Sequence, residues 1–201
     1  RTLDFDPTAI QYAQSVDFAM PSDYSGGTFA YKILWKHGAI SYSKTGTTAS
    51  GDKIISGLAS TSDLRVGMTI SGTGVGANSV IATIDSTTQV TGTVNSTASG
   101  TVTITFATAA FGVSWAVDAV AYADDGALDA AWGTAVQVND TGGTTNDQYV
   151  TPESGAVTPG GAPAARCPMI IRVRRVATDA TNDTMVIDAG LIGVQITYTR
   201  S

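Results

Sequence analysis

The stretch TFAYKILW, residues 28–35, carries a large apolar side chain at every second position. A period of two places successive side chains on opposite faces of a strand, so the pattern predicts a half-buried β-strand. Its core face is expected to carry Phe29, Tyr31, Ile33 and Trp35, and its other face Thr28, Ala30 and Lys32. A segment rich in Pro, Ser, Asp and Gly, residues 20–27, is typical of a turn leading into such a strand.

The rest of the chain has a similar texture, and it predicts an all-β fold class. The 201 residues are 43% hydrophobic and only 14% charged, with much Thr, Ser, Val and Gly, which favours short strands and tight turns. Further strands are predicted at 14–20, 53–55, 68–70, 80–84, 89–94, 101–106, 111–122, 135–138, 147–150, 168–176 and 189–199. In the last of these, one face is expected to carry Ile192, Val194, Ile196 and Tyr198. One or two helical turns are predicted only at 124–132, where Leu128 and Trp132 lie four residues apart.

The stretch 45–106 differs from its surroundings in its aromatic content. It contains no Tyr or Trp, and its single Phe is Phe106 at the very end, whereas all three Trp and all seven Tyr lie outside it. This contrast predicts a small aliphatic-cored β domain, residues 45–106, inserted into a discontinuous host domain of residues 1–44 and 107–201. Residues 42–48 and 107–110, which are polar or small, are expected to be the connectors.

Charge and cysteine content exclude several classes of partner. The formal net charge of −6 argues against nucleic acid as a partner, because binding phosphates requires clustered Lys and Arg. The single cysteine, Cys167, cannot form an intrachain disulfide and is expected to be a buried or half-buried thiol. No stretch is apolar enough to cross a bilayer and the first residues lack a signal-peptide pattern, so no membrane partner is expected, while N-terminal processing stays open.

Three features that resemble chemical sites have simpler interpretations. The glycine-rich segment SGTGVGAN, residues 71–78, precedes a predicted strand rather than a helix and lacks the lysine of a phosphate loop. The sole histidine, His37, is expected at an exposed strand end without a nucleophile nearby. Solvated acids are the favoured interpretation of the densest carboxylate group, although calcium binding stays open for Asp118, Asp124, Asp125 and Asp129. No catalytic residue, cofactor or metal site is therefore assigned, and no enzyme is expected.

Two kinds of contact residue are predicted instead. In MIIRVRR, residues 169–175, the arginines alternate with Ile171 and Val173, which favours a solvent or partner face for Arg172, Arg174 and Arg175. Arg172 and Arg174 are the candidate subunit contacts, directed at acidic neighbours. Trp132, near predicted loops, is the candidate ligand contact, whereas core packing is favoured for Trp35 and Trp115.

Parts of the host segments resemble a family of small phage virion-associated structural proteins. The resemblance rests on FDPTAIQYAQ (5–14), MPSDYSGGTFAYKILW (20–35), ALDAAWGTAVQVNDT (127–141), IIRVRR (170–175) and DATNDTMVIDAGLIGVQITY (179–198). In that family the two host halves look contiguous, which agrees with an insertion. The inserted stretch, with ISGLASTSDLRVGMTISGTGVGANSVIATID at 55–85, resembles an Ig-like module of phage and bacterial surface proteins.

The resemblance implies a jelly-roll-type β-sandwich with an inserted Ig-like β domain. It further implies a non-enzymatic structural protein at the surface of a bacteriophage virion, of capsid decoration or fibre type, with other capsid or tail proteins as partners. Lateral packing of identical copies, as a trimer or another homo-oligomer, is expected from the many small turn residues and the aliphatic strands.

Two rival functions stay open. A carbohydrate-binding module of a tail or fibre would bind a host surface glycan and would lose affinity on Trp132→Ala. A tail-associated glycan hydrolase would depend on a pair of carboxylates, yet no pair with a defined separation stands out.

Overall fold

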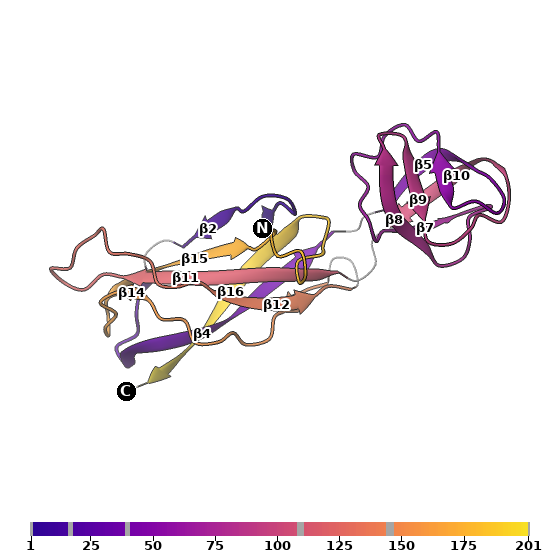
Figure 1. Cartoon of the computed structure of the whole chain (residues 1–201). Coiled ribbons are helices and arrows are strands. Elements are labelled where there is room, and N and C mark those ends of the chain that lie inside the picture. Colours follow the sequence, from indigo (N-terminus) through magenta and orange to yellow (C-terminus); the bar gives the residue numbers. More distant parts are fainter. Residues whose placement is uncertain (1, 16–17, 39–40, 108–110, 144–146, 201) are drawn as a thin grey trace. The chain divides into compact units, whose positions relative to one another are not determined.

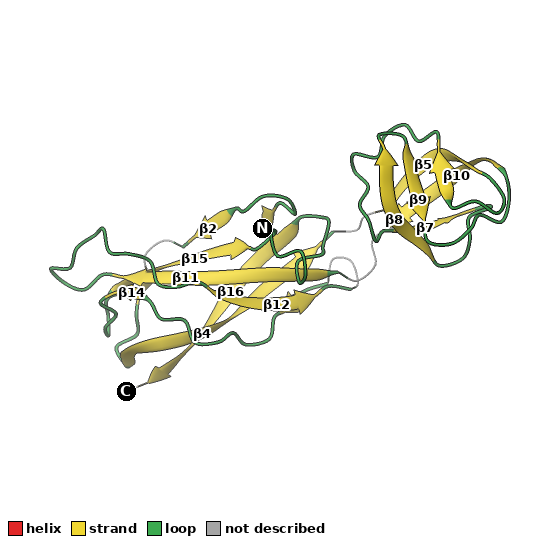
Figure 2. Cartoon of the chain, viewed as in Figure 1, coloured by secondary structure: helices red, strands yellow, loops and turns green. Residues whose placement is uncertain are grey.

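The computed structural model describes residues 2–15, 18–38, 41–107, 111–143 and 147–200, which form two units. One unit consists of residues 1–38 and 110–201, and the other of residues 39–109. The fold is all-β: the described residues contain strands, turns and loops but no helix, as Figure 2 shows. Accordingly, no helix in the described part of the chain could cross a membrane.

The larger unit contains two sheets (Figure 1). The first sheet has the order β1-β16-β4-β13, and all its pairs are antiparallel. Its strands are β1 (Leu3–Phe5), β16 (Ala189–Arg200), β4 (Tyr24–His37) and β13 (Tyr149–Val150). β4 and β16 are the longest strands of the chain and form the centre of this sheet.

The second sheet has the order β12-β11-β15-β2, also antiparallel throughout. Its strands are β12 (Val136–Thr141), β11 (Gly112–Ala121), β15 (Pro168–Arg175) and β2 (Tyr12–Gln14). Two short strands lie off this path: β3 (Phe18–Ala19) pairs with β15, and β14 (Gly160–Gly161) pairs with β11 in parallel.

A single hydrophobic core joins the two sheets into a β-sandwich. The first sheet contributes Phe29, Tyr31, Ile33 and Trp35 from β4, all of them buried, so the predicted core face of this strand is confirmed. The second sheet contributes Val113, Trp115, Val117, Ile171 and Val173. Cys167, the one cysteine, is buried beside this core as a free thiol, as predicted.

The predicted face of β16 is wrong at one residue, because the strand contains a bulge. Leu191 pairs with Trp35, but the next partner, Leu34, lies opposite Gly193, so the register shifts by one residue. An extra residue in one strand reverses the alternation of side chains beyond it. Leu191 is consequently only 8% exposed, whereas Ile192 points outward and is 41% exposed.

The helical turns predicted at 124–132 are also absent, since this segment consists of turns and loop between β11 and β12. Asp125 has a φ of +58°, which is left-handed backbone and cannot continue a right-handed helix. Its neighbour Gly126 donates its N–H to the carbonyl of Ala123, closing a turn at the place where the helix was expected to begin.

The smaller unit is a closed ring of six antiparallel strands in the order β10-β5-β6-β9-β8-β7, with β7 pairing back to β10. They are β5 (Ser41–Thr48), β6 (Ile54–Ser56), β7 (Thr69–Gly72), β8 (Ser79–Ser86), β9 (Gln89–Gly92) and β10 (Gly100–Ala107). Its interior is aliphatic apart from Phe106, with Ile55, Leu58, Leu64, Met68, Ile70, Ile81, Val90 and Ile104 buried.

Two expectations about this unit need correction. Residues 42–48 are not a connector but belong to β5, which pairs with β10 along its whole length. The alternation of this strand is hidden in the sequence because Gly46 occupies an inward position. A larger residue does not fit there, since a Cβ would lie 2.9 Å from Ile104 Cδ1 and 3.0 Å from a methyl carbon of Leu58. The ring of pairs also differs from the expected Ig-like arrangement, in which the strands divide between two separate sheets.

Candidate functional site

The outer face of the second sheet brings together the residues predicted to make contacts. In β15, Arg172 and Arg174 alternate with the core residues Ile171 and Val173, so the two arginines point away from the core. In β11, Asp118 lies directly opposite Arg172 in the strand register. We call these three residues, together with Tyr12 and Trp132, the guanidinium cluster.

An ion pair forms the centre of the guanidinium cluster. Arg172 Nε lies 2.9 Å from Asp118 Oδ1, and Arg172 Nη2 lies 2.6 Å from Asp118 Oδ2, which is the two-pronged geometry of a strong charge-assisted pair. Asp118 is only 3% exposed, and its hydrogen bonds raise the pKa of Arg172 above its ordinary value. Arg174 Nη1 approaches the same carboxylate at 3.7 Å. One carboxylate therefore faces two guanidinium groups, which leaves this surface positively charged.

Two aromatic rings cover the same arginines. Arg172 Cζ lies 4.3 Å from the ring centroid of Trp132 and 4.9 Å from that of Tyr12, and Arg174 Cζ lies 5.7 Å from the ring of Tyr12. These distances are within the range of cation–π attraction. The predicted ligand contact and the predicted subunit contact thus touch each other. Arg172 occupies a ring face of Trp132, which argues against that tryptophan as an open stacking platform.

The third arginine of the run does not belong to this surface. Arg175 is fully buried, contrary to the expectation of a solvent or partner face. It follows Arg174 immediately, and successive residues of a strand point to opposite faces. Its guanidinium lies 2.6 Å from the buried Asp183 and donates to the carbonyl oxygens of Met185, Ile187 and Phe5. Arg175 therefore holds the segment 183–187 and the end of β1 in place.

Exposed apolar side chains lie next to the guanidinium cluster. Leu3 in β1 and Tyr12 in β2 are 56% and 53% exposed, and Ile10 between these strands is 44% exposed. The three residues line one groove, together with the carboxylate-bearing Asp4. β1 and β2 are edge strands, each at one end of its sheet's main path, so this N-terminal groove follows an open edge of the sandwich.

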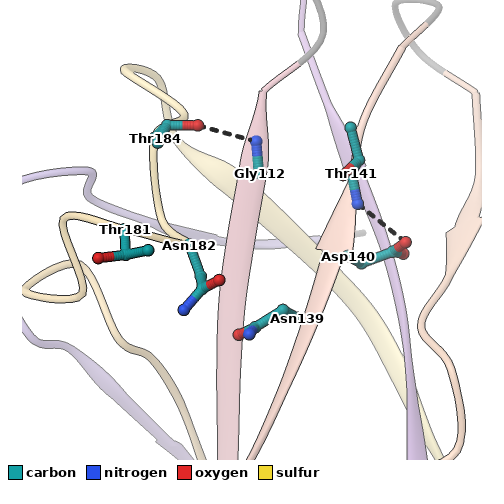
Figure 3. A pocket seen from close by; sticks show the side chains of 7 residues that line it. All are labelled: Gly112, Asn139, Asp140, Thr141, Thr181, Asn182 and Thr184. Carbon is teal, nitrogen blue, oxygen red and sulfur yellow. Dashed lines mark hydrogen bonds between the residues drawn. The ribbon is translucent and has the colours of Figure 1, made fainter.

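A second groove, drawn in Figure 3, is lined by polar side chains. It lies where β11 begins and β12 ends, which is the end of this strand pair away from the connecting loop 122–135. It contains Asn139, Asp140, Thr141, Thr181, Asn182 and Thr184 beside Gly112. Its wall is fixed by Asp179, whose carboxylate accepts hydrogen bonds from the side chains of Asn182 and Gln137. Those bonds lower the pKa of Asp179 to about 2. The groove thus offers amides and hydroxyls, and the amide of Asn182 is held in place by the ionised Asp179.

The sole histidine is not at an exposed strand end, as was expected, but is 6% exposed. The ring of His37 stacks on that of Tyr149, with centroids 5.5 Å apart and planes at 15°. Its Nδ1 lies 3.0 Å from the carbonyl oxygen of Gly38. Burial arises because His37 continues the inward face of β4 beyond Trp35, whose indole Nε1 donates to Asp140 at 2.8 Å.

The acidic residues considered for calcium divide into different environments. Asp118 is buried against Arg172, whereas Asp124, Asp125 and Asp129 are exposed on the loop between β11 and β12. Among the described residues, no three His, Cys, Asp or Glu side chains gather in a way that could hold a metal ion.

Comparisons with known proteins add no further guide: no family model, curated protein or solved structure matches this chain. Function is therefore inferred from the order of the sheets and from the guanidinium cluster and the two grooves that they carry.

Proposed function

We propose that this chain is a non-enzymatic structural protein on the surface of a bacteriophage virion. In this proposal the host is a jelly-roll-type sandwich that binds other capsid or tail subunits. The inserted barrel is displayed on one of its loops. The protein is then of capsid decoration or fibre type, as the resemblance of its host segments implies.

The order of the strands carries the proposal. Counted along the chain, β1, β2, β4, β11, β12, β13, β15 and β16 are the first to eighth strands of the two main sheet paths. The first sheet then has the order first-eighth-third-sixth, and the second sheet second-seventh-fourth-fifth. This order agrees with that of a jelly roll, an architecture of viral capsid and lectin domains, and so supports the proposed host fold. The step from architecture to function is an analogy.

The position of the barrel agrees with a display role. It is inserted between β4 and β11, the third and fourth strands of that count, and it has a core and a closed ring of strands of its own. Insertions of this kind are tolerated on surface loops, because the host core is left intact.

Rebinding to virus particles tests the proposal. Particles of the phage that encodes this chain are stripped of their surface proteins and mixed with the purified full chain, and bound protein is measured after sedimentation. We expect saturable binding with a fixed number of copies per particle. Intact particles, whose sites are already filled, serve as the control. Equal binding to stripped and intact particles, or none to either, would contradict a role as a virion surface protein.

The polar groove of Figure 3 favours a second candidate, a carbohydrate-binding module. Amide and hydroxyl side chains such as those of Asn139, Thr181 and Asn182 match the donors and acceptors of a sugar. Glycan-array binding by the isolated protein, lost in Asn139→Ala and Asn182→Ala, would support this candidate. Trp132→Ala is the matched control, because that ring packs on Arg172 and lies outside the groove.

A further inference from the structure

The loop between β11 and β12 presents an apolar side chain to solvent. Leu128 is 82% exposed, the largest exposed fraction of the large hydrophobic residues in the described part of the chain. In Figure 1 this loop, drawn in pink-orange, extends beyond the end of the two sheets. Burying this side chain in a contact would remove its apolar surface from water, which is favourable.

Three carboxylates lie within four residues of this leucine along the chain. Asp124, Asp125 and Asp129 are all exposed, and no ion pair joins any of them to another described residue. The loop therefore presents an exposed apolar side chain flanked along the chain by exposed negative charges. Its complement is an apolar groove beside positive charge.

The N-terminal groove of the same chain has that character. Leu3, Ile10 and Tyr12 supply an exposed apolar surface, and Arg174, 25% exposed, lies against the ring of Tyr12. The one acid lining this groove, Asp4, comes from β1 and not from the β2 side, where the arginines lie. The positive end of the groove is thus the end that includes Tyr12.

We propose that Leu128 of one copy docks into the N-terminal groove of a second copy, with the loop carboxylates facing Arg174. This inference rests on the proposed function, because it supplies the contact between identical copies. Each copy carries a net charge of −6, so two copies repel each other unless opposite charges meet locally. The loop and the groove are different surfaces, so the contact is head-to-tail, and repeated contacts close into a ring when the rotation between copies allows it.

Light scattering on the purified full chain at several concentrations tests the contact. We expect the native chain to exceed the single-chain mass of 20.5 kDa, and Leu128→Asp and Ile10→Asp each to return to that mass. Ile192→Asp is the matched control, because the exposed fraction of Ile192 is close to that of Ile10 but its side chain lies on the outward face of β16. This variant should keep the native mass. Circular dichroism of each variant shows whether the fold is retained. A single-chain mass for the native protein, or a native mass for a folded Leu128→Asp variant, would overturn the proposal.

Mixing the two interface variants separates this contact from a symmetric one. Leu128→Asp keeps its groove and Ile10→Asp keeps its loop, so the mixture should form pairs of twice the single-chain mass, which neither variant forms alone. A mixture that remains at the single-chain mass would overturn the loop-to-groove assignment. Particle rebinding then distinguishes the two proposals: a native monomer that rebinds stripped particles contradicts only the contact, and an oligomer that does not rebind contradicts only the virion role.

Discussion

Asp118 and Arg172 face each other on neighbouring strands, and their side chains form two hydrogen bonds of 2.9 and 2.6 Å on the outer face of the sandwich. The carboxylate is almost fully buried although it lies on the face of β11 that points away from the core between the two sheets. The arginines cover the carboxylate of Asp118, and the rings of Trp132 and Tyr12 pack on the arginines in turn. Two guanidinium groups beside one carboxylate leave this surface positively charged.

Removing Arg172 should destabilise the larger unit. Arg172→Ala leaves Asp118 buried with only Arg174 at 3.7 Å, and breaking a buried pair from one side costs more than the pair itself contributes. Because Arg174 partly compensates, we expect a loss of about 2–3 kcal/mol in the free energy of unfolding, measured by urea titration. Arg200→Ala removes a largely exposed pair with Asp23 and should cost less than about 0.5 kcal/mol. Equal losses of unfolding free energy in the two variants would contradict a larger contribution from the buried pair than from the exposed one.

Trp132 should matter for stability. Trp132→Ala removes the ring that packs on Arg172, so the loss combines apolar burial with a cation–π contact and amounts to about 2 kcal/mol. Trp132→Phe keeps a ring and should lose less than half of this. Thermal unfolding followed by circular dichroism gives both values, and an unchanged midpoint for Trp132→Ala would contradict a structural role of the ring.

The carboxylate of Asp179 beside the polar groove should titrate at unusually low pH. The pKa of Asp179 is lowered from its ordinary value of 3.8 to about 2 by hydrogen bonds from Asn182 and Gln137. Because the folded pKa is the lower one, these bonds stabilise the fold above about pH 4, and their contribution is lost as the pH falls toward 2. Gln137→Ala should raise the pKa of Asp179, observed through its carboxyl carbon by NMR. Asp85 in the barrel, held instead by Thr83 and Thr91, should not change.

The two units should unfold separately. Phe106 is fully buried in the barrel core, and Phe106→Ala should destabilise that unit by about 3–4 kcal/mol. Amide hydrogen exchange read by mass spectrometry should then show loss of protection in residues 41–107 and native protection in β4 and β11. A parallel loss in both units would indicate that they unfold as one.

Side-chain alternation made the strands of the larger unit predictable. The period of two in TFAYKILW assigns Phe29 and Trp35 to the core without any knowledge of their partners. The bulge at Leu191 and Gly193 was not predictable in this way, because an inserted residue becomes visible only when the opposite strand is known. Strand β5 was missed for a related reason: Gly46 stands at an inward position where the period predicts an apolar side chain, and only the neighbouring Ile104 explains its size.

The candidate site was predictable residue by residue but not as an arrangement. Arg172, Arg174 and Trp132 stood out by their type and their neighbours, yet their meeting depends on the pairing of β11 with β15. Tyr12 comes from the distant strand β2, where it lies in register with Arg174. Asp118 was grouped with Asp124, Asp125 and Asp129 because of its nearness in the sequence. Its partner is a residue on another strand, which spacing along the chain cannot reveal.

The closed ring of the barrel has one more consequence. Every one of its strands has a neighbour on both sides, so none of them is an edge strand to which a strand of another molecule would readily add. Such a module can be crowded at high local concentration without seeding β-aggregation between copies. The host sandwich lacks this protection at the four strands that end its two sheet paths, β1, β13, β12 and β2, so close packing of copies requires a specific covering contact there.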